Sequence, residues 1–294
     1  MAEITASLVK ELRECTGAGM MECKKALSES EGDLDAAVDI LRTRGLAALA
    51  KKAHRATNEG TIAAFVSADS KVGVLVEVNS ETDFVGRNAE FTGFAAELAE
   101  HIAAEAPADV ENLLAQTISA RGITVSELFG EKVSKLGENM GVARFAREEI
   151  TGTGAVATYI HGGGKIGVIV TYAFNNADTA AKPEFQTFAK DVAMQVAASA
   201  PMKTNRDEIG ADVVEHELSI YRAQAAESGK PEAIQQKMAE GRLEKFYKEV
   251  VLTEQVFVKN PDITVAQYAA QTGKSVGDTL SVVAFDRFVL GASA

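Results

Sequence analysis

Apolar residues occupy every second position in two stretches of the chain that lie about 94 residues apart. They are Val72, Val74, Val76 and Val78 in the first stretch and Ile166, Val168, Val170 and Tyr172 in the second. Side chains two residues apart lie on the same face of a β-strand. Each stretch therefore predicts a half-buried strand with one face toward a hydrophobic core.

An apolar stripe with a spacing of three and four residues follows each predicted strand. Its members are Phe91, Phe94, Ala95, Leu98 and Ile102 after the first strand and Phe185, Phe188, Ala189, Val192 and Val196 after the second. On an α-helix this spacing places side chains on one face. We therefore expect two helices, each covering one face of a sheet.

The strands and helices belong to an internal duplication. Residues 60–107 overlay residues 154–201 without a gap, with roughly 15 identities in 48 positions. Each copy contains two strands and a helix, which predicts an α+β fold with a duplicated β-β-α core. We place the two core subdomains at residues 60–139 and 140–294.

Four segments outside the duplicated stretches complete this prediction. Residues Val110–Gly137 are expected to be helical, and residues 140–148 are expected to form a strand that enters the second subdomain. Near the end of the chain, a short helix over Thr264–Gln271 belongs to a carboxyl-terminal module at about residues 261–278. A closing strand over Thr279–Leu290 is expected to complete the sheet.

The amino-terminal part of the chain predicts three short helices. They span Thr5–Thr16, Met20–Glu31, and a segment that Asp33 caps and that runs to Gly45. Three helices in a unit of this size resemble the ubiquitin-associated type of domain, which we place at residues 1–50. A polar linker at residues 51–59 follows it.

A helical hairpin is predicted at about residues 211–247. Its apolar residues at helical spacing are Val214, Leu218, Tyr221, Ile234 and Met238. A Gly-Lys-Pro segment within Glu227–Pro231 breaks the chain between the two helices. One interpretation is a hairpin packed on its own domain; the other, which the narrow seam and its polar flanks favour, is an antiparallel coiled-coil arm that contacts something else.

The two copies differ most sharply in the turn between strand and helix. The first copy has Thr82-Asp83-Phe84-Val85, and the second has Asn176-Ala177-Asp178-Thr179. Phe84 belongs to neither the strand pattern nor the helix stripe, and Asp178 stands at its matching position. Phe84 is therefore either local core under the helix or an exposed anchor for a partner. Loops held by a rigid scaffold are where binding residues concentrate, and aromatic side chains often dominate interfaces.

Composition limits the partners that this chain suits. Its 294 residues are 46% hydrophobic, with a net charge of −12 and a pI near 5.0. This charge argues against a general binder of nucleic acid or anionic membrane, because phosphate contacts need clustered Lys and Arg. The basic cluster of Lys51, Lys52, His54 and Arg55 is interpreted as a solvated helix end. With neither a signal-peptide pattern at the start nor a long apolar run, we expect a cytoplasmic protein.

Two motifs resemble catalytic signatures but lack the required context. His161-Gly162-Gly163-Gly164 is similar to an esterase oxyanion loop, yet it is interpreted more simply as a hairpin turn. Gly273-Lys274-Ser275-Val276-Gly277 has the spacing of a nucleophile elbow, but a helix precedes Ser275 and no His follows His216. The remaining histidines have no ligand spacing, so no catalytic residue, metal site or cofactor is predicted. Two hypotheses remain: a protein-binding factor that acts through Phe84, and an enzyme whose site residues are too scattered to recognise.

Three motifs together resemble bacterial elongation factor Ts, the family of nucleotide-exchange factors for elongation factor Tu. They are the Thr82–Val85 turn, the segment Thr16–Leu27 and the segment Gly137–Met140. The resemblance implies a helical amino-terminal domain, a duplicated core, a dimerising coiled-coil arm and a carboxyl-terminal module. It also implies that the turn of Thr82, Asp83, Phe84 and Val85 enters the GTPase domain of elongation factor Tu. There Asp83 and Phe84 are expected to disturb the helices beside the nucleotide and dislodge Mg²⁺.

The resemblance implies further partner contacts at Met20 and Met21 and at His161. On the residues themselves, adjacent methionines cannot both face one core, so one of this pair is expected to be exposed and to suit an adaptable contact surface. The alternative interpretation places one Met in the core and the other merely at its rim. The implied function is release of GDP from elongation factor Tu, without a chemical step by this chain. The alternative is a non-catalytic adaptor that binds a protein through the Phe84 turn.

Overall fold

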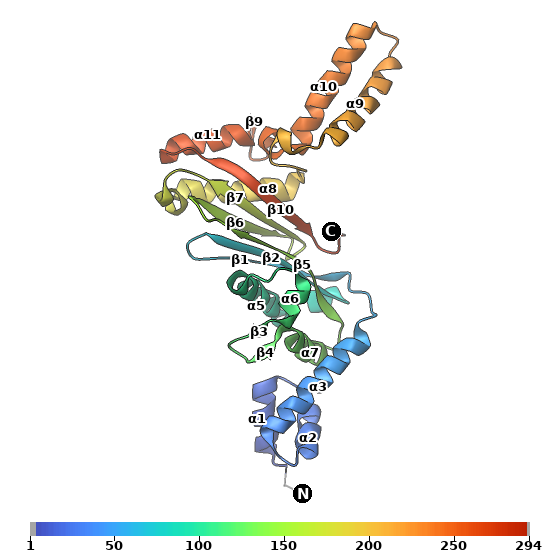
Figure 1. Ribbon diagram of the computed structural model, residues 1–294, viewed down its shortest axis with the longest axis vertical. Helices are drawn as coiled ribbons and strands as arrows, with labels where there is room; N and C mark the ends of the chain where they lie inside the picture. The colour runs from blue at the N-terminus through green and yellow to red at the C-terminus, as the bar shows by residue number, and fades with distance from the viewer. Residues whose placement is uncertain (1–3, 293–294) are drawn as a thin grey trace.

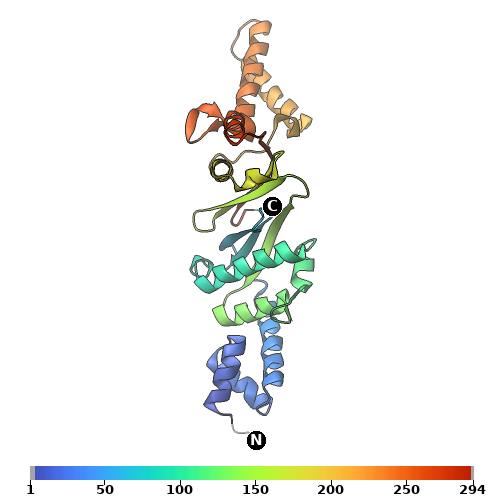
Figure 2. The same ribbon diagram turned by 90° about the vertical axis from the view of Figure 1, so that its left-hand side faces the viewer.

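The computed structural model of the chain describes residues 4–292. The molecule is elongated, with the amino-terminal helices at one end, a helical hairpin at the other and β-sheets between them (Figure 1). A view turned by a quarter shows the same order of layers (Figure 2). Over the described residues, none of the helices combines the length and the apolar composition needed to cross a membrane.

Three helices form the amino-terminal unit. They are α1 (Ala6–Thr16), α2 (Met20–Glu29) and α3 (Leu34–Lys52). The side chain of Thr5 caps α1 and that of Asp33 caps α3, as the sequence suggested. The expected end of the third helix at Gly45 is wrong. Helix α3 continues for two more turns to Lys52. Gly45 lies inside it against the backbone of Gly130, where the lack of a side chain lets two helices approach closely.

The first sheet contains three antiparallel strands in the order β1-β2-β5. Their bounds are β1 (Glu59–Val66), β2 (Val72–Ser80) and β5 (Met140–Glu149). Strand β5 pairs with β2 along its whole length, with Phe145 opposite Val76. The strand expected to enter the second subdomain therefore completes the first sheet.

Helices α4 (Asp83–Gly86) and α5 (Ala89–Glu105) follow β2. The predicted helical stretch before β5 is interrupted: it consists of α6 (Val110–Ala115), a small hairpin of β3 (Thr117–Ile118) and β4 (Ile123–Thr124), and α7 (Val125–Leu136). The interruption has a local cause, because the Thr124 and Glu127 side chains form a capping box that starts a new helix.

The second sheet repeats this plan in the order β10-β7-β6. Its elements are β6 (Gly154–His161), β7 (Ile166–Ala173), η1 (Ala177–Ala181), α8 (Pro183–Ser199) and β10 (Ser281–Val289). Strand β10 pairs with β7, which confirms the expected closing strand.

The two sheets pack face to face, with α5 and α7 outside the first sheet and α8 and α11 outside the second (Figure 1). This arrangement corrects the prediction of half-buried strands. The helix stripes cover one face of β2 and β7, as expected, but the opposite face is buried between the sheets. The buried residues between the sheets are Ile62, Leu75, Val156, Ile169 and Phe288.

The contact between the sheets is two-fold symmetric in its details. A Cβ atom at Gly167 would lie 2.5 Å from Cγ2 of Ile62, and a Cβ atom at Gly73 would overlap the matching residue of the other copy, Val156. The backbone N–H of Ile62 donates to the carbonyl of Gly164, and that of Val156 donates to Ser70, each over 2.8 Å. Each copy therefore packs against the other and hydrogen-bonds to it through equivalent positions.

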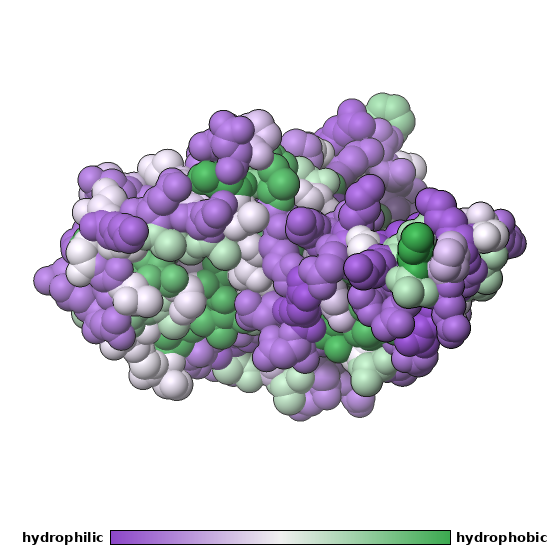
Figure 3. All heavy atoms as spheres, turned by 90° about the horizontal axis from the view of Figure 1, so that it is seen from above, coloured by the Kyte–Doolittle hydropathy of each residue, from purple (hydrophilic) through white to green (hydrophobic). Residues whose placement is uncertain are grey.

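The predicted helical hairpin is formed by α9 (Ala211–Ala226) and α10 (Glu232–Val250), between the short helices η2 (Arg206–Glu208) and η3 (Leu252–Glu254). Its seam differs from the prediction, since Ile234 is 45% exposed, whereas Ala225, Ala239 and Tyr247 are buried. Figure 3 looks down from the hairpin end and shows separate hydrophobic patches between hydrophilic side chains.

The duplication extends beyond the stretches that overlay without a gap. Strands β8 (Val256–Phe257) and β9 (Asn260–Thr264) with α11 (Val265–Val276) repeat the hairpin and helix before β5. Helix α11 has its own capping box, from Thr264 and Gln267, and runs beyond the predicted end at Gln271. Arg147 of β5 and Arg287 of β10 each donate to the end of the preceding long helix, at the carbonyls of Ala103 and Ala197. Each copy therefore ends in a third strand, and the helical hairpin α9–α10 is an insertion in the second copy.

Candidate partner-binding site

The turn that differs between the copies is a single helical turn, α4, and its aromatic residue faces water. Phe84 is 85% exposed, the most exposed large hydrophobic side chain of the described residues. The interpretation of this ring as local core is therefore wrong. A phenyl ring left in water forgoes about 2 kcal/mol of burial free energy, so it is available to a partner.

The residues around Phe84 hold the turn against the core. Val85 packs against the hydrophobic core that lies between the first sheet and helix α5, and Gly86 is buried. A Cβ atom at Gly86 would lie only 2.7 Å from the carbonyl oxygen of Gly60, so the turn approaches the start of β1 more closely than other residues allow. Asp83 forms an ion pair of 3.0 Å with Arg87 and remains 41% exposed. The turn thus presents an acidic and an aromatic side chain on a supported backbone.

A set of polar contacts beside the turn was not predicted from the sequence. The carboxylate of Glu81 accepts a hydrogen bond from the backbone N–H of Asn139 over 2.6 Å and pairs with Arg55 over 3.3 Å. These contacts, the Asn139 N–H first, lower the pKa of Glu81. The Asn139 side chain donates to the carbonyl of Arg55 over 2.8 Å. The one sequence feature that could have indicated these contacts is the acidic residue Glu81 directly before the turn, because the second copy has the neutral Asn175 at the matching position.

The matching turn of the second copy carries no aromatic residue. Asp178 lies exposed in η1, and Thr179 is the buried residue there. Ala180 occupies the position that matches Gly86. The two turns therefore share their place in the fold and differ in what they expose.

The structure brings His161 to the same end of the sheets as Phe84. His161 ends β6, is exposed, and its Nδ1 lies 3.1 Å from the hydroxyl of Tyr159. The hairpin that follows accepts the hydrogen bond from Ile62. Since the Phe84 turn packs on Gly60, the turn and the His161 hairpin both contact the first residues of β1.

The methionine pair lies in a different unit, at the start of α2. Met20 is 59% exposed and Met21 is 75% exposed. The interpretation that placed one of them in the core is wrong, because the buried stripe of α2 begins at Cys23. The residues lining a groove beside the pair are Ile4, Ala6, Val9, Lys10, Arg13 and Lys24.

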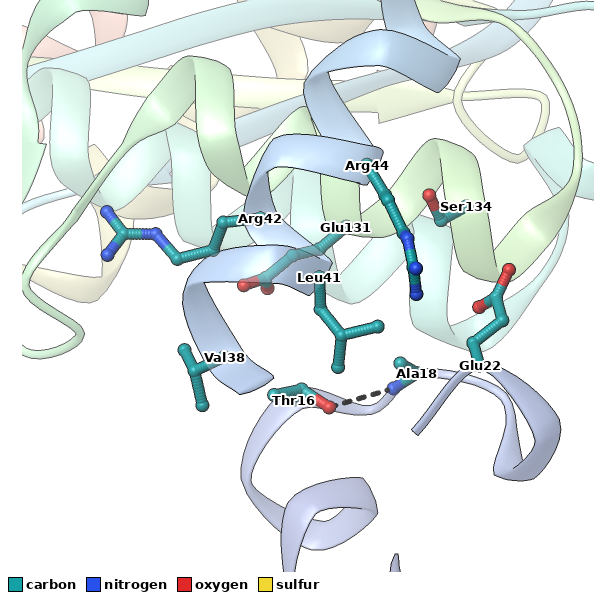
Figure 4. Close-up of a pocket in the computed structure, with 9 residues that line it drawn as sticks. All are labelled: Thr16, Ala18, Glu22, Val38, Leu41, Arg42, Arg44, Glu131 and Ser134. Atoms are coloured by element: carbon teal, nitrogen blue, oxygen red, sulfur yellow. Dashed lines mark hydrogen bonds between the residues drawn. The ribbon is translucent and has the colours of Figure 1, made fainter. Parts of the chain in front are cut away.

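A small cavity lies where this unit meets α7, but it is too small for a ligand. Its volume is about 30 Å³, enough for little more than a water molecule. The side chains around it come from the α1–α2 region, α3 and α7: Thr16, Ala18, Glu22, Val38, Leu41, Arg42, Arg44, Glu131 and Ser134 (Figure 4). Burial raises the pKa of Glu131, and Arg42 reaches Glu127 over 2.7 Å. These contacts join the amino-terminal unit to α7.

The two motifs that resembled catalytic signatures serve the fold. Ser275 lies inside α11, so no strand precedes it. Gly162, Gly163 and Gly164 form the tip between β6 and β7, as the hairpin interpretation predicted. Among residues 4–292, no three His, Cys, Asp or Glu side chains are grouped to hold a metal ion.

Comparison with known proteins identifies the family. The family model described as "Elongation factor TS" matches residues 81–292, which include the Phe84 turn. Elongation factor Ts of Trichlorobacter lovleyi is 47% identical over 289 residues, which is 98% of this chain and 93% of the relative. Those of Clostridioides difficile (48% identity; 99% and 94% covered) and Nitratidesulfovibrio vulgaris (46%; 99% and 97%) are similar to the same extent. The chain belongs to the elongation factor Ts family.

Proposed function

We propose that this translation elongation factor binds elongation factor Tu in its GDP form and promotes GDP release in the cytoplasm. The observation that carries the proposal is the exposed side chain of Phe84 on a turn whose neighbouring residues, Val85 and Gly86, pack against the core and against β1. In this proposal Asp83 and Phe84 enter the GTPase domain of the partner. They disturb the helices beside the nucleotide and displace Mg²⁺.

The physical basis of exchange is linkage between two ligands. If this chain weakens the hold of elongation factor Tu on GDP, then GDP weakens the hold on this chain by the same factor. The Mg²⁺ ion is the largest positive charge beside the phosphates, so its displacement speeds GDP release. No covalent step or proton transfer by this chain is required, and we propose that it is not an enzyme in that sense.

Other exposed groups extend the proposed interface. His161 lies at the same end as the Phe84 turn and supplies a polar contact. Met20 and Met21 supply adaptable apolar contacts from the amino-terminal unit. Because α3 links that unit to α7 through Gly45 and Gly130, we propose that the methionine pair is held at a defined distance from the turn.

The proposal is tested by the release of fluorescent GDP from elongation factor Tu, with and without this chain, at matched Mg²⁺. We expect release to accelerate with chain concentration and to saturate. A stoichiometric complex that leaves the release rate unchanged would favour the adaptor hypothesis. Turnover of a small molecule by the isolated chain would favour an enzyme with scattered site residues.

The methionine pair is tested by the double variant Met20→Ser/Met21→Ser. We expect a higher chain concentration for half-maximal exchange and a nearly unchanged rate at saturation. This variant is preferable to removal of residues 1–50, because the truncation would strip part of α3 from α7. Loss of the saturated rate in a folded double variant would contradict this division of roles.

We further propose that the α9–α10 hairpin mediates self-association. Its two helices bury few side chains between them and leave Ile220 37% and Ile234 45% exposed. We expect Ile220→Ser/Ile234→Ser to lower the mass measured by light scattering, since both residues lie outside the seam. An unchanged mass would contradict a dimerising hairpin and would leave the exchange proposal untouched.

A further inference from the structure

Glu138 lies between α7 and β5 and holds the start of the Phe84 turn with both carboxylate oxygens. Its Oε2 accepts a hydrogen bond from the backbone N–H of Thr82 over 3.0 Å. Its Oε1 accepts a hydrogen bond from the Thr82 hydroxyl over 2.6 Å. Hydrogen bonds to an ionised carboxylate are short and strong compared with those between neutral groups.

These two bonds decide the orientation of the Thr82 side chain. Because the hydroxyl donates its proton to Glu138, its oxygen is free to accept from the backbone N–H of Val85. That capping bond is 3.4 Å long and is weak by itself. The carboxylate of Glu138 therefore fixes the first residue of the turn, and the cap depends on it.

The second copy supplies independent evidence that this position supports the turn. Asp278 lies at the equivalent point before β10, after the left-handed glycine that ends α11. Its carboxylate accepts from the backbone N–H groups of Asn175 and Asn176 over 3.0 and 2.9 Å, and from the hydroxyl of Thr179 over 2.7 Å. These bonds, that of Thr179 first, hold the pKa of Asp278 well below its usual range. Both copies thus hold their turn with a carboxylate from the same place in the fold.

We infer that Glu138 is a positioning residue for exchange, which fixes the turn of residues 82–85 so that Phe84 meets the partner in one orientation. The inference rests on the proposed function. Glu138 itself lies behind the turn and is only partly exposed. It acts through Phe84, and its matched partner Asp278 holds a turn that has no aromatic residue to present.

The test compares Glu138→Ala, Glu138→Gln and Asp278→Ala in the full chain. We expect Glu138→Ala to lower the GDP release rate at saturation about tenfold, with a smaller change in the half-maximal concentration. Glu138→Gln keeps one acceptor oxygen, so its rate should lie between those of Glu138→Ala and the unchanged chain. Asp278→Ala should leave the GDP release rate unchanged, although its melting temperature is expected to fall at least as much as that of Glu138→Ala.

A double variant separates positioning from general stability. If Glu138 acts through Phe84, then adding Glu138→Ala to Phe84→Ala should lower the saturated rate no further. Three results would overturn the inference: an unchanged rate in Glu138→Ala, an equal loss in Asp278→Ala, or a full further loss on top of Phe84→Ala. Normal exchange by Phe84→Ala alone would instead contradict the proposed function.

Discussion

The two ends of the paired sheets are built alike and expose different chemistry. At one end the turn of residues 82–85 contacts β1, beside the hairpin that carries His161; at the other, η1 contacts β6, beside the hairpin that begins at Ser67. Equivalent strands and helices flank both turns, and a carboxylate from the same place in the fold, Glu138 or Asp278, supports each. One end exposes Phe84 and His161. At the matching positions the other end has the exposed Asp178 and the half-buried Ser67, whose hydroxyl is hydrogen-bonded within its own hairpin. A duplicated scaffold thus separates what the fold requires from what one end alone adds.

The comparison also shows which positions the scaffold keeps. A side chain of the other copy packs directly against Gly73 in the first copy and against Gly167 in the second. In the same way, Arg147 and Arg287 each donate to a backbone carbonyl at the end of a helix. These pairs are retained because the packing needs them in each copy. Phe84 has no such counterpart, so packing does not explain it.

Replacement of Phe84 is expected to have the largest effect on binding. Phe84→Ala should weaken the complex with elongation factor Tu·GDP by about 2 to 4 kcal/mol, or about 30- to 1000-fold, as for an aromatic interface anchor. Isothermal titration calorimetry measures this change. Asp178→Ala is the matched control and should bind normally. A Phe84→Ala chain that melts far below the unchanged protein would mean that the ring stabilises the fold instead.

The close approach of the turn to β1 gives the next largest effect. Gly86→Ala places a Cβ atom 2.7 Å from the Gly60 carbonyl, so the turn must shift. Overpacking of this kind costs about 1 to 3 kcal/mol, and we expect about tenfold slower GDP release at saturation. Gly93→Ala is the control, because a Cβ atom there meets nothing within 4 Å. Exchange by Gly86→Ala at the unchanged rate would show that the position of the turn does not matter.

His161 is expected to contribute less than the turn. Removal of one exposed polar contact costs about 1 kcal/mol, so His161→Ala should weaken the complex about fivefold. Ser67→Ala is the twin control and should have no effect on binding. Equal losses in both variants, measured by the same calorimetry, would mean that the two ends do not differ in function.

The third strands of the two copies allow a small test of stability against pH. Burial raises the pKa of Asp286 in β10, and burial together with Asp286 raises the pKa of Glu148 in β5. The folded chain therefore holds these protons more tightly than the unfolded chain, and stability falls as the pH rises through the raised pKa values. Asp286→Asn should raise the melting temperature near pH 7 and change it little near pH 4. The same gain at both pH values would exclude the ionised carboxylate as the cause.

The sequence predicted the repeated elements well, because strong local patterns specify them. The alternating valines and the helix stripes located β2, β7, α5 and α8, and the absence of an aromatic at Asp178 singled out Phe84. Burial on the second face of β2 was not predictable, since only the pairing of the sheets covers Leu75. The third strand was misplaced for a similar reason, because long-range pairing alone assigns Phe145 to the first sheet.

The contacts that support the site were the least predictable part. Glu138 follows Thr82 by 56 positions, and Glu81 reaches Asn139 across 58. Such bonds depend on where β5 begins, which no local pattern shows. The sequence predicts a helix end at Gly45 because glycine commonly ends helices. In the structure Gly45 lies inside α3, and its lack of a side chain lets α7 approach closely.

Replacement of Asp83 and Phe84 by the residues at the matching positions of the second copy tests the central claim most directly. The variant Asp83→Ala/Phe84→Asp gives the first turn the residues that the second copy carries at the matching positions, and leaves Thr82, Glu138 and the core unchanged. The measurement is the rate of fluorescent GDP release from elongation factor Tu at saturating chain and matched Mg²⁺. We predict that release falls to nearly the rate without the chain, while the melting temperature stays within a few degrees of the unchanged protein. Release at the full rate from this variant would contradict the claim that Asp83 and Phe84 drive exchange.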